Sequence, residues 1–216
     1  PIKITNTLHE ILSRNNISQL AVAETVKFGH ITYYFNGNSY EPAKKEEFLE
    51  IKSDIRPFDE RPWMKAAEIT DAVLEKISET DPNGKPKYQF VRINYAGGDM
   101  VGHFGELEPT IVAMEAIDLQ LDRLAKVVDR LGGMMIITAD HGNAEEVYDP
   151  NTKQPKTSHT TNPVPCWFYD NTQNSSLYQI NQIEHSGLSN VAPTIAKLFN
   201  IHDLPSSWRK PLVKNI

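Results

Sequence analysis

Two clusters of acidic and histidine residues each follow a short apolar run. Asp140 and His141 directly follow the run at residues 134–139, and Asp99 and His103 stand in the same relation to a run at residues 88–95. If each run is a buried strand, these polar side chains lie at its carboxyl end, where α/β folds bind ligands. Carboxylates and imidazoles are the side chains that bind transition metals. The pattern therefore predicts a metal site.

Either cluster alone has a simpler explanation. The Asp99 cluster lies among four glycines and fits an ordinary connection between a strand and a helix, and Asp140-His141 fits a solvated strand end. Their conjunction favours a metal, and His159, just before another apolar run, is a further candidate ligand. Mixed carboxylate and imidazole donors suit Mn²⁺, Zn²⁺ or Co²⁺, and Mg²⁺ less well. Two such ions ~4 Å apart would clamp a transferring phosphoryl group.

The elements that must position these residues alternate along the chain. Apolar spacing predicts strands at residues 19–24, 88–95, 134–138 and 164–169, and helices at residues 4–14, 62–77, 109–131 and 188–199. Breakers support the boundaries: a turn is expected at residues 36–38, and Gly132-Gly133 closes the long helix. This alternation predicts an α/β fold, a mostly parallel sheet with helices on both faces, in one domain over residues 1–216.

Composition excludes several classes of protein. The chain has 216 residues, is 39% apolar and has a formal net charge of −6, with no basic stripe for nucleic acid. Its single cysteine, Cys166, permits no intrachain disulfide, which fits the cytoplasm. No apolar run approaches the ~20 residues that cross a bilayer. We therefore expect a globular protein with neither nucleic-acid nor membrane partners.

Four motifs stand out along the chain: Ala23-Glu24-Thr25-Val26-Lys27 with Phe35-Asn36-Gly37, Gly98-Asp99-Met100-Val101-Gly102-His103, Asp140-His141-Gly142-Asn143-Ala144-Glu145, and Ser158-His159-Thr160-Thr161-Asn162-Pro163-Val164-Pro165. Together they resemble a known family. Their order and spacing are similar to those of the cofactor-independent (2,3-bisphosphoglycerate-independent) phosphoglycerate mutases, in the alkaline-phosphatase-like superfamily, from about residue 8 to about residue 200. Enzymes of this family interconvert 3-phosphoglycerate and 2-phosphoglycerate in glycolysis through a phosphoserine.

The resemblance implies two divalent metal ions and no 2,3-bisphosphoglycerate. Mn²⁺ is the expected metal, with Mg²⁺ or Co²⁺ as alternatives. By motif, Asp99, His103 and His159 are expected to bind one ion. Asp140 and His141 are expected to form half of the second site.

Lys27 is expected to act on the substrate, stabilising the charge of the phosphoryl group. Without the matching motif it would be taken for a solvated surface lysine. The sequence departs from the family at Phe28-Gly29, where tyrosine and alanine are usual, and at Phe104, where threonine is common. The bulk of Phe104 beside His103 puts the local packing in question.

The resemblance also predicts that this chain is the carboxyl-terminal part of a larger enzyme. Family members are more than twice as long, and the chain starts at Pro1 without a methionine. The nucleophilic serine, an aspartate of the second metal site and an inserted phosphotransferase domain are expected to lie in the missing amino-terminal segment. Ser158 is expected to be a loop hydroxyl. We expect the fragment to be inactive, to hold at most one ion firmly and to self-associate through its uncovered apolar surface.

Two other hypotheses remain open. The chain could belong to another metalloenzyme of the same superfamily, a phosphopentomutase or a phosphatase. It could instead be a non-catalytic module whose acids and histidines are only polar strand ends. The Lys27 motif and the run at residues 158–165 favour the mutase.

Overall fold

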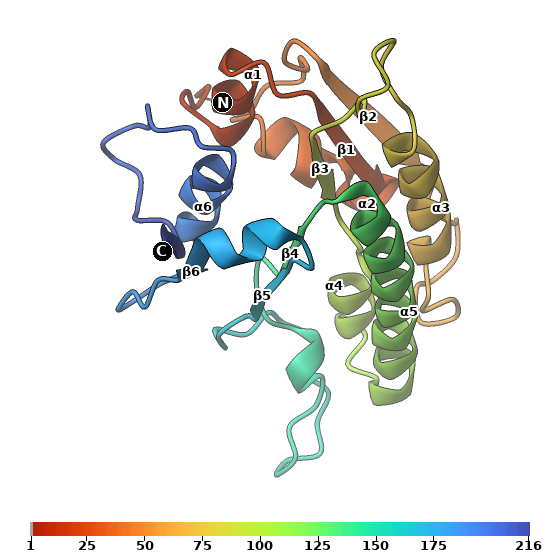
Figure 1. The fold of residues 1–216 in the computed structure, drawn as a ribbon. Coiled ribbons are helices and arrows are strands. Elements are labelled where there is room, and N and C mark those ends of the chain that lie inside the picture. Colours follow the sequence, from red (N-terminus) through yellow and green to blue (C-terminus); the bar gives the residue numbers. More distant parts are fainter. Residues whose placement is uncertain (1) are drawn as a thin grey trace.

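Three parallel strands form the central sheet of the computed structural model, which describes residues 2–216 (Figure 1). The strands are β1 (Gln19–Glu24), β2 (Glu46–Ile51) and β3 (Phe90–Ile93), in the order β2-β1-β3. Gln19 of β1 pairs with Glu46 on one side and with Phe90 on the other. All six residues of β1 are buried, as expected of the middle strand of a parallel sheet. The predicted parallel sheet is confirmed.

Two long helices cover one face of this sheet. Leu20 and Val22 of β1 form one buried cluster with Ile69 and Val73 of α3 (Ala66–Ile77) and with Leu124 of α5 (Leu107–Leu131). The two helices run side by side along the sheet (Figure 1). Because side chains alternate along a strand, the intervening residues of β1 point to the opposite face.

The opposite face is covered by other segments, so the prediction of helices on both faces is confirmed. Ala21 and Ala23 pack against Ile31, which lies in a π-helical turn at His30–Tyr34. Phe90 of β3 packs against a separate cluster built from α1 (Leu8–Arg14) and α6 (Val191–Leu198).

Helix boundaries follow the expected local chemistry. Thr7 and Glu10 form a capping box that starts α1, several residues after the predicted start. At the other end of the long helix, Gly132 has φ +66°, and the N–H of Gly133 donates to the carbonyl of Val128 at 2.9 Å. The prediction that the helix closes at the paired glycines is confirmed. The predicted turn at residues 36–38 is also present, with Gly37 at φ +67° and Asn38 at φ +65°.

The strand after the long helix departs from the expected crossover pattern. β4 (Met135–Thr138) pairs antiparallel with β5 (Cys166–Tyr169), and within residues 2–216 no pairing joins β3 to β4. Met135 nevertheless packs against the cluster that contains Val91 and Ile93 of β3. The crossover through α5 therefore brings β4 to the same core without making it a neighbour of β3 in the sheet. Over the same described residues, β3 and β4 each keep one edge without a paired strand.

Several short elements complete the fold. β6 (Tyr178–Ile180) pairs antiparallel with β7 (Val213–Asn215), and short helices α2 (Thr25–Gly29) and α4 (Gly97–Gly102) follow β1 and β3. The sequence patterns did not predict these four elements or β2. Among residues 2–216, no helix is both long and apolar enough to span a membrane.

Candidate metal centre

The predicted site residues come from the carboxyl ends of three strands and from one loop. Lys27 lies on α2, directly after β1, and Asp99 lies on α4, after β3. His103 caps the carboxyl end of α4. Asp140 and His141 follow β4. His159 lies in an irregular segment before β5.

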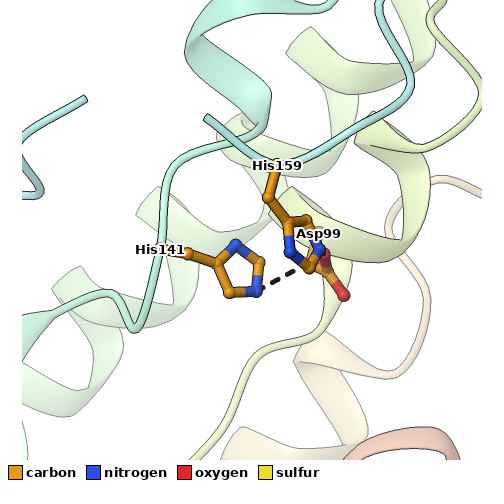
Figure 2. A group of neighbouring side chains, drawn as sticks. All are labelled: Asp99, His141 and His159. Atoms are coloured by element: carbon orange, nitrogen blue, oxygen red, sulfur yellow. Dashed lines mark hydrogen bonds and ion pairs between the residues drawn. The ribbon is translucent and has the colours of Figure 1, made fainter. Parts of the chain in front are cut away.

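One carboxylate oxygen is the centre of the cluster (Figure 2). Oδ1 of Asp99 lies 2.9 Å from Nε2 of His159 and 3.7 Å from Nε2 of His141, the two histidines that Figure 2 shows. It also lies 3.1 Å from Nε2 of His103. The two nitrogens of His159 and His103 are 3.1 Å apart. Three imidazoles therefore turn the same ring atom toward one carboxylate.

Ring contacts and a backbone carbonyl orient these imidazoles. The rings of His141 and His159 are stacked, with centroids 3.6 Å apart and planes 20° apart. Nδ1 of His103 lies 2.5 Å from the carbonyl oxygen of Thr157. If Nδ1 donates its proton to this carbonyl, Nε2 carries the lone pair that a metal needs.

Lys27 approaches the same carboxylate from the other side. Its ammonium lies 2.6 Å from Oδ2 of Asp99, and both side chains are only 12–13% exposed. Burial by itself would raise the pKa of Asp99, but the hydrogen bond and charge of Lys27, helped by His103 and His141, outweigh it and lower the pKa. Asp99 is therefore held as an anion, the form that binds a cation.

The remaining sequence candidates lie outside this cluster. The side chain of Asp140 is 68% exposed, and its Oδ1 comes no nearer than 3.7 Å to Nε2 of His141. Ser158 is exposed, in agreement with a loop hydroxyl. Phe104 is 37% exposed, so its bulk points partly to solvent and leaves the cluster intact.

Two residues next to the cluster had no role in the sequence analysis, although they belong to the quoted motifs. Asn143 is buried, and its side-chain nitrogen lies 3.4 Å from the backbone oxygen and 3.5 Å from Oδ1 of Asp99. Glu145 accepts the N–H of Asn143 at 2.7 Å and the amide of Asn162 at 2.9 Å. Burial opposes ionisation of Glu145, but its hydrogen bonds, first those from Thr160 and Asn162, lower its pKa.

The donor set fits a divalent transition metal. Asp99, His141 and His159 each offer a ligand atom, all within 4.8 Å of one another, and His103 adjoins them. Ligand atoms about 3 Å apart match donors that each sit about 2.1 Å from one ion. Three nitrogens and a carboxylate favour Mn²⁺, Co²⁺ or Zn²⁺ over Mg²⁺. The close group combines ligands that the resemblance divides between two ions.

Known proteins with similar sequences share this region. A family model described as the metalloenzyme superfamily matches residues 1–203. The "2,3-bisphosphoglycerate-independent phosphoglycerate mutase 2" of Methanosarcina barkeri is 41% identical over 202 residues, which are 93% of this chain and 36% of that protein. A "probable" enzyme of the same name from Leptospira interrogans is 39% identical and covers 100% of this chain and 40% of its own length.

A solved structure has the same fold. The phosphoglycerate mutase of Leishmania mexicana, determined at low cobalt concentration, superposes with a TM-score of 0.89 at 35% identity. The match covers 100% of this chain and 40% of that one. The chain thus spans about two fifths of the length of the relatives that it matches.

Proposed function

Because the chain belongs to the metalloenzyme superfamily, we propose that it is the metal-binding part of a 2,3-bisphosphoglycerate-independent phosphoglycerate mutase. The observation that carries the proposal is the convergence of three imidazoles and Lys27 on the Asp99 carboxylate. The names of the relatives supply the reaction class, that of a phosphoglycerate mutase. The proposed reaction is the interconversion of 3-phosphoglycerate and 2-phosphoglycerate. A cytoplasmic location is part of the same proposal.

In the proposed site, Asp99, His103 and His159 hold one divalent ion, and His141 with Asp140 holds part of a second. When bound, the ions lower the pKa of a nucleophilic hydroxyl and neutralise charge on the phosphoryl oxygens. Mn²⁺ is the proposed metal, and 2,3-bisphosphoglycerate is not required. The exposed side chain of Asp140 is free to turn toward the second ion.

Lys27 is the group of this chain that would touch the substrate. Its side chain is largely shielded from solvent beside Asp99, and its ammonium is held there by the 2.6 Å ion pair, so it is already placed when the phosphoryl group arrives. A preorganised cation of this kind stabilises charge as it develops in the transition state. Lys27 would then exchange part of its contact with Asp99 for the phosphoryl oxygens.

The open sheet supports a role for the rest of the enzyme. β3 and β4 each keep an unpaired edge, share one core cluster and lead into Asp99 and His141 respectively. A parallel strand placed between them would end beside these two residues. We propose that the amino-terminal segment supplies this strand, the nucleophilic serine and the remaining ligands. The chain alone would then be inactive.

Other functions have weaker support. A phosphopentomutase or a phosphatase would share the superfamily, but the relatives described above carry the mutase name at 39–41% identity. A non-catalytic module would give no reason for three Nε2 atoms to face one carboxylate oxygen. The mutase remains the best-supported function.

Mn²⁺ binding tests the proposal directly. Isothermal titration with Mn²⁺, and anomalous scattering from a soaked crystal, should show an ion between Asp99, His103 and His159. Asp99→Asn should abolish binding, whereas His185→Ala, which alters a fully solvated imidazole, should not. Absence of any anomalous peak at this position would contradict the metal site. Mutase activity of the 216 residues alone would contradict the proposed division of the enzyme.

A further inference from the structure

The segment that carries His159 has no helix or strand to fix it. His159 is 48% exposed in its side chain, and residues 157–163 are irregular apart from a single bridge between Gly142 and Thr160. In that bridge the N–H of Thr160 donates to the carbonyl of Gly142 at 2.8 Å. The position of this imidazole therefore depends on contacts with neighbouring segments, among them the loop that carries His141.

The Glu145 carboxylate makes several contacts that tie these loops together, and Oε2 of Glu146 adds a longer one, 3.4 Å from the amide nitrogen of Asn162. Oε1 of Glu145 accepts hydrogen bonds from the hydroxyl of Thr160 and, at 2.9 Å, from the amide of Asn162. Oε2 of Glu145 accepts the N–H of Asn143 at 2.7 Å. Thr160 directly follows His159, and Asn143 lies two residues after His141. Glu145 thus joins side chains that follow one candidate ligand to the backbone that follows another.

The backbone at Gly142 is shaped around this link. A Cβ at this position would lie closer to the Thr160 hydroxyl and the Glu145 carboxylate than any Cβ lies to a neighbour in real structures. The absence of a side chain therefore allows the two loops to come together at Gly142. The close approach and the hydrogen bonds involve the same three residues, Gly142, Glu145 and Thr160. This agreement indicates that the contact is a specific feature of the two loops.

We propose that Glu145 is a positioning residue that clamps the His159 loop onto the His141 loop. It does not belong to the group of close ligand atoms, so it acts through His159. The consequence for metal binding rests on the proposed function, in which His159 is a ligand. Glu145→Gln should weaken the clamp, because its single amide oxygen cannot accept both from the N–H of Asn143 and from the side chains of Thr160 and Asn162.

Amide hydrogen exchange of the metal-free chain tests the clamp itself. In Glu145→Gln and Glu145→Ala the amide of Thr160 should exchange about tenfold faster or more, since charge-assisted hydrogen bonds are lost. Glu115→Gln, the same change at an exposed position of α5, should leave this amide unchanged. The buried amide of Val22 reports global folding. If Val22 also loses protection, Thr160→Val, which removes only the hydroxyl donor, decides the question. Unchanged exchange at Thr160 in these variants would overturn the proposal.

Mn²⁺ titration then tests the consequence. Glu145→Gln should weaken Mn²⁺ binding about 10- to 100-fold, the usual effect of losing a group that orients a ligand. In a His159→Ala background the same change should have no further effect, because a residue that acts through His159 has nothing left to position. An equal loss in both backgrounds would show that Glu145 acts elsewhere. If the unmodified chain binds no Mn²⁺, the proposed function fails, and the exchange experiment still decides the clamp.

Discussion

Removing one partner of the buried ion pair between Arg92 and Glu46 should be one of the most destabilising single changes in this sheet. Nη2 of Arg92 lies 2.6 Å from Oε1 of Glu46, and their side chains are 7% and 0% exposed. The other oxygen of Glu46 accepts Asn36 Nδ2 at 2.8 Å and the N–H of Ala43 at 2.7 Å. Arg92 also donates through Nε to the carbonyl of Ile31 at 2.7 Å. This network joins β2, β3 and the covering turn.

Glu46→Ala would leave a guanidinium buried without its anion and two further donors without an acceptor. Breaking a buried pair in this way costs about 3–5 kcal/mol, whereas exposed pairs contribute about 0.2–1 kcal/mol. Against a total stability of about 5–15 kcal/mol, the loss is a large fraction. Burial, partly offset by the charge of Glu46, lowers the pKa of Arg92, but the group remains charged and must be paired.

Urea unfolding measures this cost, provided that the slope of the unfolding free energy against urea concentration is the same in the variants. Asp122→Ala, which breaks the exposed pair with Lys126 on α5, is the matched control and should cost less than about 1 kcal/mol. The double variant Arg92→Met with Glu46→Met should cost less than the sum of the single changes, because it leaves no unpaired charge. A loss for Glu46→Ala no larger than that for Asp122→Ala would refute the reasoning and indicate that water reaches the pair.

Four further outcomes follow from the structure. Burial raises the pKa of Glu24 despite its hydrogen bond to Ser53. The folded state therefore keeps a proton on this carboxyl at pH values at which the unfolded state has lost it. Stability should fall as pH rises from 4.5 through the raised pKa. Glu24→Gln should flatten this dependence in urea unfolding. Lys27→Met should tighten Mn²⁺ binding about tenfold in calorimetry by removing a cation 2.6 Å from Asp99, while lowering turnover of an intact enzyme about 10²-fold. Gly132→Ala should cost about 1 kcal/mol, because φ is +66° and no atom lies near the added Cβ. Sedimentation should show self-association through exposed apolar residues of α5, and a monomer with a cooperative melt would contradict this.

Sequence patterns predicted the elements whose apolar period is long or regular. The long helix ending at Gly132 and the buried strand at Gln19–Glu24 are both present, because their local signals agree with their burial. β2 was not predicted, because three of its six residues are glutamates. One of them, Glu46, is buried with Arg92 of β3 as its ionic partner. A local sequence pattern cannot reveal a partner that lies 46 positions away along the chain.

The candidate site was predictable to a similar extent. Motif positions identified Asp99, His103, His141 and His159, and the structure brings their side chains together. The same motifs contain Glu145, but its effect depends on the contact between two loops, which spacing along the chain does not reveal. Whether each residue binds a metal remains a prediction.

Charge balance links the open sheet to the proposed division of the enzyme. Around Asp99, one carboxylate faces three imidazoles and a lysine, so a divalent ion placed there would meet little negative charge from this chain. Asp140 adds a second carboxylate only if it turns inward from solvent. A strand inserted between β3 and β4 would end at this point, and acidic or hydroxyl groups there would supply the missing charge. Under the proposed function, firm binding of two ions would therefore require both parts of the enzyme, whereas this chain alone would offer the ligands for one.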